Sequence, residues 1–374
     1  MSDATLKQRE PPDRPWSAMA AEWLRENLFS SWASILLTLL SIAFIVVAVP
    51  PILDWAIFSA VWSGDAREAC LGAGKGACWP YIADRSGQMI YGFYDAVERW
   101  RVDIVYLVGA AGIAWLMIPR LPGKLWVGLA MVFAFPLLVY VLLSGGMFGL
   151  PIVPSSKWGG LLLTLLISLT GIVVSMPLGI LLALGRQSDL PVIRWLSIGF
   201  IEFVRGVPLI MILFMASNLM PLFLPSGWNP DKLLRALVAI SLFSSAYMAE
   251  VVRGGLAAIP KGQREAAAAL GLGYWRTTAL ITMPQALKIS LPSIVSSCIS
   301  LFKDTSLISI MGFFDFLQVI KSGNSDPAWS TPNTAFTGYL FAALVYFAFC
   351  FGMSRYSAYL ERTVGGGKVG TGKA

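Results

Sequence analysis

The chain has few charged residues, no histidine and only four cysteines, and each shortage excludes something. Only 13% of its 374 residues are charged, whereas a soluble domain carries about 25%. Without histidine or cysteines at ligand spacing, we expect no zinc or other transition-metal site. The sequence also lacks the Gly-x4-Gly-Lys-Ser/Thr phosphate loop and a recognisable nucleophile-and-base constellation. We therefore expect neither ATP hydrolysis, enzymatic activity nor a bound cofactor in this chain.

Long apolar runs are what the chain has in abundance, since 56% of its residues are hydrophobic. Runs of about 20 residues recur, the length an α-helix needs to cross a hydrocarbon core of about 30 Å. Barrel strands are alternating segments of about ten residues, which these runs are not. We predict an all-α polytopic membrane protein with eight transmembrane helices. The expected spans are Trp32–Pro50, Val102–Ile118, Leu125–Leu143, Gly160–Leu184, Trp195–Met220, Ala236–Val252, Ile289–Met311 and Phe336–Gly352.

The net charge of +7 is a matter of topology rather than of nucleic-acid binding. The N-terminus, the loops after the second, fourth and sixth spans, and the C-terminal tail hold most of the lysines and arginines. Cytoplasmic loops carry this excess. We expect both termini on the cytoplasmic side of the membrane, and no nucleic-acid partner. Residues 1–15 are polar and proline-rich ahead of a full-length span, so no cleavable signal peptide is expected.

Four regions follow from the distribution of spans. Residues 1–30 are expected in the cytoplasm, with apolar residues at helical spacing that suit an amphipathic helix at the membrane interface; an ordinary cytoplasmic helical turn is the alternative. A three-helix extension, residues 31–148, includes a long outer, periplasmic segment over 54–101. Five spans occupy residues 157–360, and a glycine-rich cytoplasmic tail, expected to be disordered, covers 361–374.

The cysteines agree with that orientation. Cys70 and Cys78 lie eight residues apart in the outer segment, where an oxidising compartment permits a disulfide. A pair of free thiols is the open alternative. Cys298 and Cys350 lie within apolar spans and are interpreted as small packing residues.

Charged residues within the spans are candidate functional residues because a charge at the bilayer centre is costly. Glu202 and Arg205 lie three apart and can pair on one helix face, and Gly206-Val-Pro208 then interrupts that helix. Glu250 lies near the inner end of the sixth span, and Lys303-Asp-Thr-Ser306 lies in the seventh. A Lys and an Asp together suit a zwitterionic ligand. Structural ion pairs and a proton or ion pathway are the competing interpretations.

A compact loop motif separates the sixth and seventh spans. Glu265-Ala266-Ala267 is followed after three residues by Gly271, and nine residues later by Ile281-Thr-Met-Pro284. The alanines favour a short, smooth helix, the glycine allows a sharp turn, and Glu265 offers a charge to a partner.

This motif resembles the coupling (EAA) loop of bacterial ABC-importer permeases, with Met283 where leucine is usual. Residues 157–360 resemble the polar amino-acid permeases of the histidine, arginine and glutamine type. The three-span extension resembles the enlarged permeases of general L-amino-acid importers, the AapM/BztC type. The resemblance implies a five-helix type I importer core, with the coupling loop at 258–284. It also implies a second homologous permease, two ATPase subunits that bind ATP and Mg, and a periplasmic amino-acid-binding protein as partners.

The resemblance also suggests roles for particular residues. The amino acid is expected at Lys303 and Asp304 first, with Glu250, Arg205 and Ser306 as further candidates. The ATPase contact is expected at Glu265, Ala266, Ala267 and Gly271. The alternative function is an ion- or proton-coupled carrier or channel with no ATPase partner, which would have no use for this loop.

Overall fold

The structure is a computed structural model that describes residues 16–72, 74–225 and 227–364. It divides into two compact units, which meet at Pro80 and Tyr81 within the expected outer segment. The expectations for residues 1–15 and for the tail after residue 364 lie outside the described residues.

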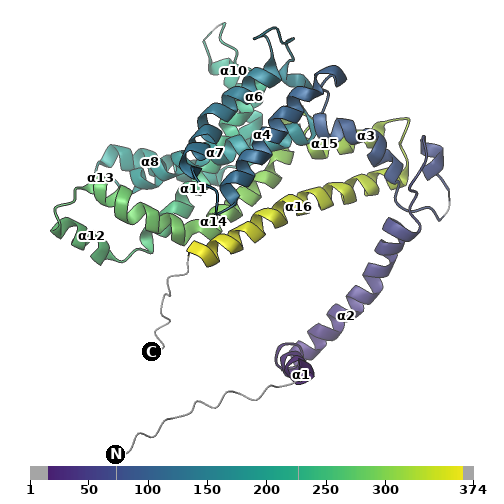
Figure 1. Ribbon diagram of the computed structural model, residues 1–374, viewed down its shortest axis with the longest axis horizontal. Helices are drawn as coiled ribbons and strands as arrows, with labels where there is room; N and C mark the ends of the chain where they lie inside the picture. The colour runs from purple at the N-terminus through teal and green to yellow at the C-terminus, as the bar shows by residue number, and fades with distance from the viewer. Residues whose placement is uncertain (1–15, 73, 226, 365–374) are drawn as a thin grey trace, which may run out of the picture. The chain divides into compact units, whose positions relative to one another are not determined.

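Helices make up the regular structure of the described residues (Figure 1). Unit 1 holds α1 (Trp16–Asn27) and α2 (Trp32–Leu53), and α3 (Trp79–Tyr91) crosses the boundary. In the second unit follow α4 (Arg99–Met117), α5 (Lys124–Leu129), α6 (Phe135–Ser144), α7 (Gly160–Arg186), α8 (Pro191–Gly206), α9 (Leu209–Phe214), α10 (Met220–Phe223), α11 (Lys232–Ala257), α12 (Lys261–Ala269), α13 (Tyr274–Thr277), α14 (Met283–Asp304), α15 (Phe316–Ser322) and α16 (Pro332–Val364).

The predicted membrane class and number of spans are confirmed. Within the described ranges, seven helical stretches are long and apolar enough to cross a membrane, and a bent pair brings the number to eight. That pair, Pro191–Gly206 and Leu209–Phe223, turns by 101° at the predicted interruption. Val207 there is extended, as expected before Pro208, because the proline ring disfavours a helical residue ahead of it.

Unit 1 contains the disulfide that the sequence permits. Cys70 and Cys78 are joined by a disulfide, and both side chains are buried. Nearby, the Trp62 and Trp79 rings stack with centroids 5.6 Å apart, and Trp79 Nε1 donates a 3.0 Å hydrogen bond to the Ala56 carbonyl. The segment after α2 is therefore a cross-linked, aromatic-stabilised fold rather than an open loop.

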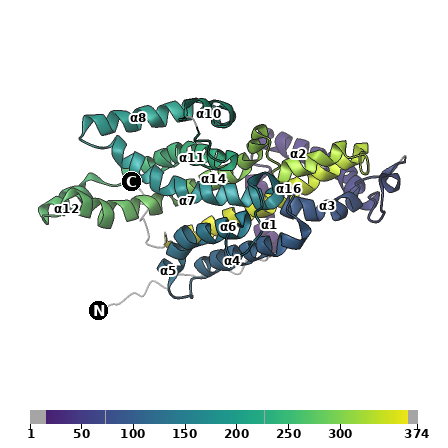
Figure 2. The ribbon, with the colours of Figure 1, turned by 90° about the horizontal axis from the view of Figure 1, so that it is seen from above.

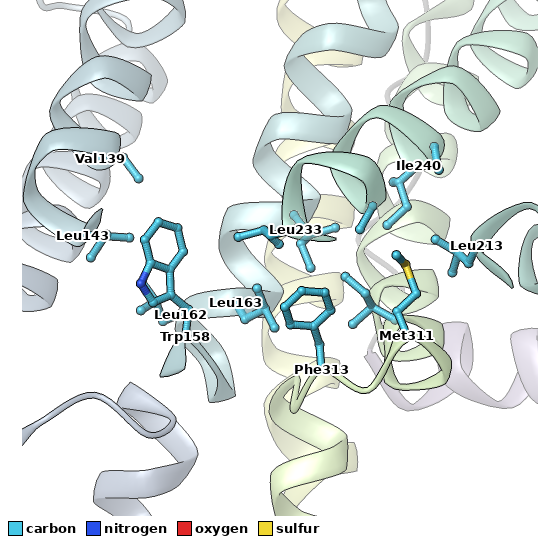
Figure 3. Close-up of a cluster of buried hydrophobic side chains, with 14 of the residues drawn as sticks. Val139, Leu143, Trp158, Leu162, Leu163, Leu213, Leu233, Ile240, Met311 and Phe313 are labelled. Atoms are coloured by element: carbon cyan, nitrogen blue, oxygen red, sulfur yellow. The ribbon is translucent and has the colours of Figure 1, made fainter. Parts of the chain in front are cut away.

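The centre of unit 2 is formed by α7, α11 and α14, which lie side by side (Figures 1 and 2). Small residues allow the close approach: a Cβ on Gly179 would lie 2.7 Å from the Met248 Cβ, and one on Gly255 would lie 2.5 Å from the Ala286 carbonyl oxygen. At the N-terminal ends of α7 and α11, a buried apolar cluster links these helices with α6 and the segment after α14 (Figure 3). Its labelled members include Leu143, Trp158, Leu163, Leu233, Ile240, Met311 and Phe313.

The second and third spans are tied together by one buried arginine. Arg101, on α4, is fully buried; its guanidinium contacts Glu98 Oε2 at 2.6 Å and donates to the Pro151 carbonyl at 3.0 Å. Tyr94 donates a 2.9 Å hydrogen bond to the Leu143 carbonyl at the end of α6. Because the buried guanidinium meets both a carboxylate and a carbonyl oxygen, this polar junction is tolerated beside apolar helices.

Asp315 marks the start of α15 and is fully buried. Its carboxylate accepts hydrogen bonds from the backbone N–H groups of Leu317 and Gln318, at 3.1 and 3.2 Å. Burial raises the pKa of Asp315 to about 6, against the opposing effect of those two donors and of Lys321.

This pKa predicts a pH dependence of stability. The folded pKa lies above the unfolded value of 3.8, so the stability from the neutral carboxyl is fully present below about pH 4. It is lost as the pH rises through about 6, a change on the order of 3 kcal/mol. We expect the melting temperature of the detergent-purified protein to rise from pH 7.5 to pH 5. Asp315→Asn keeps an acceptor at the helix start, and an equal rise in that variant would contradict the assignment.

Candidate functional site

A cavity of about 310 Å³ lies among α7, α11 and α14. This volume is at the lower end of the range for small-molecule sites, about 300–1,000 Å³. Its lining mixes hydroxyl groups, one carboxylate and apolar side chains: Ser175, Ser244, Tyr247, Ser296, Ser297, Ser300 and Asp304, with Ile172, Phe243, Met248, Cys298 and Leu301. Such an arrangement can hold a small polar molecule that carries a positive charge.

The polar face of α14 explains how the sequence builds this cavity. Ser296, Ser300 and Asp304 recur every fourth residue, so they share one face of the helix. The sequence analysis does not predict Ser296 and Ser300 as site residues. Polar residues at every fourth position inside an apolar span are the signal that could have identified them. The partners from α7 and α11 carry no comparable local signal, because their meeting depends on packing.

The predicted pair of Lys303 and Asp304 is separated by the structure. Asp304 is the last residue of α14, is partly buried and lines the cavity. Lys303 is exposed, does not line the cavity, and its ammonium makes no ion pair with the residues described. Ser306 donates a 2.9 Å hydrogen bond to the Lys303 carbonyl, in the 3-10 turn that follows α14. Of these three residues, Asp304 alone faces the cavity.

A cluster of charges lies toward the C-terminal ends of α7, α8 and α11. Arg186 contacts both Glu202 Oε1 and Glu250 Oε1 at 2.8 Å. Glu250 also pairs with Arg253 at 3.0 Å and with Arg205 at 3.7 Å. One carboxylate, only 17% exposed, thus faces three guanidinium groups from three helices.

The ion pair of Glu202 with Arg205 that their spacing permits is not the one that forms. Both residues instead bond to other helices, Glu202 to α7 and Arg205 to α11. A spacing of three residues permits a pair within one helix. Packing of the three helices offers a more buried carboxylate, Glu250, to which Arg205 turns.

Tyr247 connects the charge cluster to the cavity. Its ring lines the cavity, and the Arg205 guanidinium lies over the same ring, 5.7 Å from the centroid. A cation over an aromatic face is attracted by the ring's quadrupole. Glu250 and Arg205 do not line the cavity. Arg205 contacts Tyr247, which lines it, and Glu250 pairs with Arg205.

The predicted coupling segment is a short helix with a defined end. The Gly271 N–H donates to the Ala268 carbonyl at 2.9 Å, and the Leu272 N–H donates to the Ala267 carbonyl at 3.0 Å. This pair of bonds is a Schellman motif, which requires a left-handed residue, and Gly271 has φ of 73°. The sequence's glycine thus ends α12 and reverses the chain toward α13.

The surface of this segment is exposed and partly apolar. Glu265 and Ala266 are exposed, whereas Ala267 is buried against the protein. Leu270 is 79% exposed and Trp275 is 70% exposed. Large exposed side chains beside a polar helix are typical of a surface that a partner protein covers. Arg264 donates to Gln187 Oε1 at 3.4 Å, which connects α12 to the end of α7.

Sequence similarity to known proteins identifies the class of transport protein to which the chain belongs. The sequence profile of the binding-protein-dependent transport system inner membrane components matches residues 175–366. The chain belongs to this family, whose members are membrane subunits of ABC transporters that work with ATPase and substrate-binding-protein partners. It is a multi-pass membrane protein and a transport subunit. The matched range includes the end of α7, the charge cluster, α12 and α14.

Two relatives extend the similarity over nearly the whole chain. The inner membrane amino-acid ABC transporter permease protein YhdY of Escherichia coli K12 is 49% identical over 99% of this chain and 100% of its own length. The glutamate/glutamine/aspartate/asparagine transport system permease protein BztC of Rhodobacter capsulatus is 40% identical over 97% of this chain and 98% of its own. The crystal structure of an amino acid ABC transporter with histidines has a chain that is 28% identical, covering 55% of this chain and 92% of that one, with a TM-score of 0.47.

The charge cluster generates a stability prediction. Glu250→Gln removes the negative charge from among three guanidinium groups, and we expect it to cost on the order of 2 kcal/mol and to lower the melting temperature. Glu202→Gln is the matched control: its side chain is 55% exposed and meets one arginine, so we expect about 1 kcal/mol or less. Thermal unfolding in detergent measures both. Equal losses would contradict the central position of Glu250.

Proposed function

We propose that this chain is the permease subunit that carries L-amino acids into the cytoplasm in a binding-protein-dependent ABC importer. The observation that carries the proposal is the cavity at the centre of unit 2, with a carboxylate at one end and serine hydroxyl groups along it. Family membership and the names of the near-full-length relatives support the amino-acid class. A periplasmic binding protein delivers the amino acid, and ATP with Mg is bound and hydrolysed by two partner ATPase subunits.

In this proposal Asp304 binds the ammonium group of the amino acid. A carboxylate in a partly apolar cavity makes short, charge-assisted hydrogen bonds to an ammonium group. The serine hydroxyls can donate to the carboxylate or to a polar side chain of the amino acid. Arg205 and Glu250 act on the inner wall through Tyr247. Lys303 and Ser306 stay predictions for substrate contact, although their side chains do not line this cavity.

The ATPase subunits act on the transmembrane helices through α12. Glu265, Ala266 and Leu270 present an exposed surface, and Ala267 anchors the helix to the permease. Movement of α12 reaches α7 through Arg264 and Gln187, and reaches α14 along the chain through α13. Both α7 and α14 line the cavity, so a displacement at α12 can change its access.

The wider assembly and topology follow from the same proposal. The five spans of residues 157–360 form the translocating core, and the three-span extension of residues 31–148 precedes it. A second, homologous permease completes the pathway. Both termini and the 258–284 loop lie in the cytoplasm, because the loops on that side hold most of the basic residues. No observation favours the alternative, a carrier or channel that works without an ATPase.

The substrate site predicts a transport defect. In the complete complex in proteoliposomes, Asp304→Asn should raise the half-saturating amino-acid concentration roughly 10-fold or more, since a hydrogen bond to a charged group contributes about 1.5–3 kcal/mol. Lys303→Gln, at the adjacent exposed position, should change it less.

A native thiol provides a second measurement of the same site. Cys298 lines the cavity, whereas Cys350 does not, so bound amino acid should slow alkylation of Cys298 and leave Cys350 as the internal control. Unchanged transport by Asp304→Asn together with no protection of Cys298 would exclude this cavity as the substrate site.

The coupling segment predicts a defect that leaves substrate binding intact. Gly271→Ala places a side chain at φ of 73°, which costs about 1 kcal/mol and weakens the turn after α12. We expect severalfold less ATPase activity stimulated by the loaded binding protein. Gly262→Ala is the matched control, because that glycine lies within α12 and a Cβ added there would meet nothing within 4 Å. Full stimulation in the Gly271 variant would show that the turn does not transmit the ATPase motion.

A further inference from the structure

A second cavity of about 310 Å³ is lined by α3 and by the segment that joins α14 to α16. In unit 2, these two elements lie at the end opposite α12 (Figure 1). Its charged and polar lining comes from Arg85, Gln88, Ser322 and Asp326, and Phe93 and Phe314 contribute aromatic faces. It shares no lining residue with the cavity that contains Asp304. Neither the family nor the predicted site residues account for it.

The walls of this cavity are held by long-range hydrogen bonds. The fully buried Tyr81 donates to the Ile320 carbonyl at 2.8 Å, and Trp329 Nε1 donates to Asp84 Oδ2 at 2.8 Å. Gly323 makes room for the Tyr81 ring, since a Cβ there would overlap it. The two faces are thus joined by side chains from residues more than two hundred positions apart, and the cavity between them is a preformed site.

The charges in this cavity form a pair that a ligand can open. Arg85 and Asp326 make an ion pair with side chains 32% and 21% exposed, and Arg85 Nε also lies 3.5 Å from Asp84 Oδ2. Arg85 Nη1 also donates to Gln88 Oε1 at 3.3 Å. A partly exposed ion pair contributes little to stability, so separating it is inexpensive. A molecule with both a carboxylate and an ammonium group would replace this one pair with two, one to each protein charge.

We propose that this outer cavity binds a free zwitterionic α-amino acid, with its carboxylate on Arg85 and its ammonium group on Asp326. The guanidinium fork suits a carboxylate, which it can bind through two parallel hydrogen bonds. Phe93 and Phe314, whose rings meet edge to face at 5.1 Å, supply an apolar wall for the side chain of the amino acid. The site is a second one for the transported class of molecule, and the choice of amino acids as that class rests on the proposed function.

The α3 side of this site lies outside the segment that the family profile matches, residues 175–366, while the facing wall lies inside it. The two near-full-length relatives cover both walls. A chain limited to the segment that the family profile matches would lack Arg85.

The test uses Ser322→Cys in the complete complex in lipid nanodiscs, with alkylation of each cysteine quantified by peptide mass spectrometry. L-glutamine, L-glutamate and L-arginine serve as separate probes. At least one of them should slow alkylation of Cys at position 322 by fivefold or more. Ser325→Cys is the matched control, because that exposed serine lies in the same segment but does not line the cavity.

Charge variants then test the assigned contacts. Added to Ser322→Cys, Arg85→Gln should raise the half-protecting concentration at least tenfold and Arg85→Lys much less, while Asp304→Asn should leave it unchanged. If the Arg85→Gln complex does not assemble, Asp326→Asn provides the same comparison. Protection of Cys298 without protection at position 322 would overturn the outer site and leave the proposed function standing. Absence of protection at both positions would contradict both.

Discussion

The close approach of α7 and α11 positions both the charge cluster and the cavity of unit 2. Gly179 leaves no room for a side chain beside Met248, so the two helices meet with their backbones near each other. In a membrane the hydrophobic effect does not drive helices together, and small residues at the contact allow van der Waals packing to do so. Because these helices touch there, Arg186 at the end of α7 reaches Glu250 on α11, and α14 packs beside both to enclose the cavity.

The charges of unit 2 divide into two kinds of site. Toward the C-terminal ends of α7, α8 and α11, Glu250 neutralises part of a three-arginine cluster, and the bent helix pair is anchored to α11 through Arg205. Such a cluster is stable as long as all its partners stay in place, which makes it suited to hold one arrangement of helices at a time. Asp304, in contrast, lies at the cavity with hydroxyl groups around it and no arginine of that cluster in contact. The charges around Glu250 hold helices together, and the carboxylate of Asp304 faces a cavity that a ligand can enter.

The segment α12 is connected to the cavity along the polypeptide chain, because α14, which lines the cavity, follows α12 and α13 in sequence. The Schellman motif at Gly271 ends α12, and α13 and a π-helical turn over Thr278–Thr282 lead directly into α14. Pro284 lies in the first turn of α14, directly after this π-helical turn. In the proposed function, a displacement of α12 reaches the helix that carries Asp304 along the chain, through the turn at residues 270–273 and α13. This continuity explains why a motif recognised from twenty consecutive residues bears on a cavity in the membrane.

Features that depend on neighbours along the chain could be predicted from the residues alone. Apolar length predicted eight spans, Gly206-Val-Pro208 predicted the break after α8, and the spacing from Glu265 to Pro284 predicted the short helix α12 and its turn. Which distant residues meet depended on the packing of the helices: Arg186 with Glu250, Arg205 with Glu250 instead of Glu202, and Tyr81 with Ile320. It also separated Asp304, which faces the cavity, from Lys303, which does not. The physical reason is that periodicity sets the face on which a residue lies, whereas the partner opposite that face is chosen by the packing of whole helices.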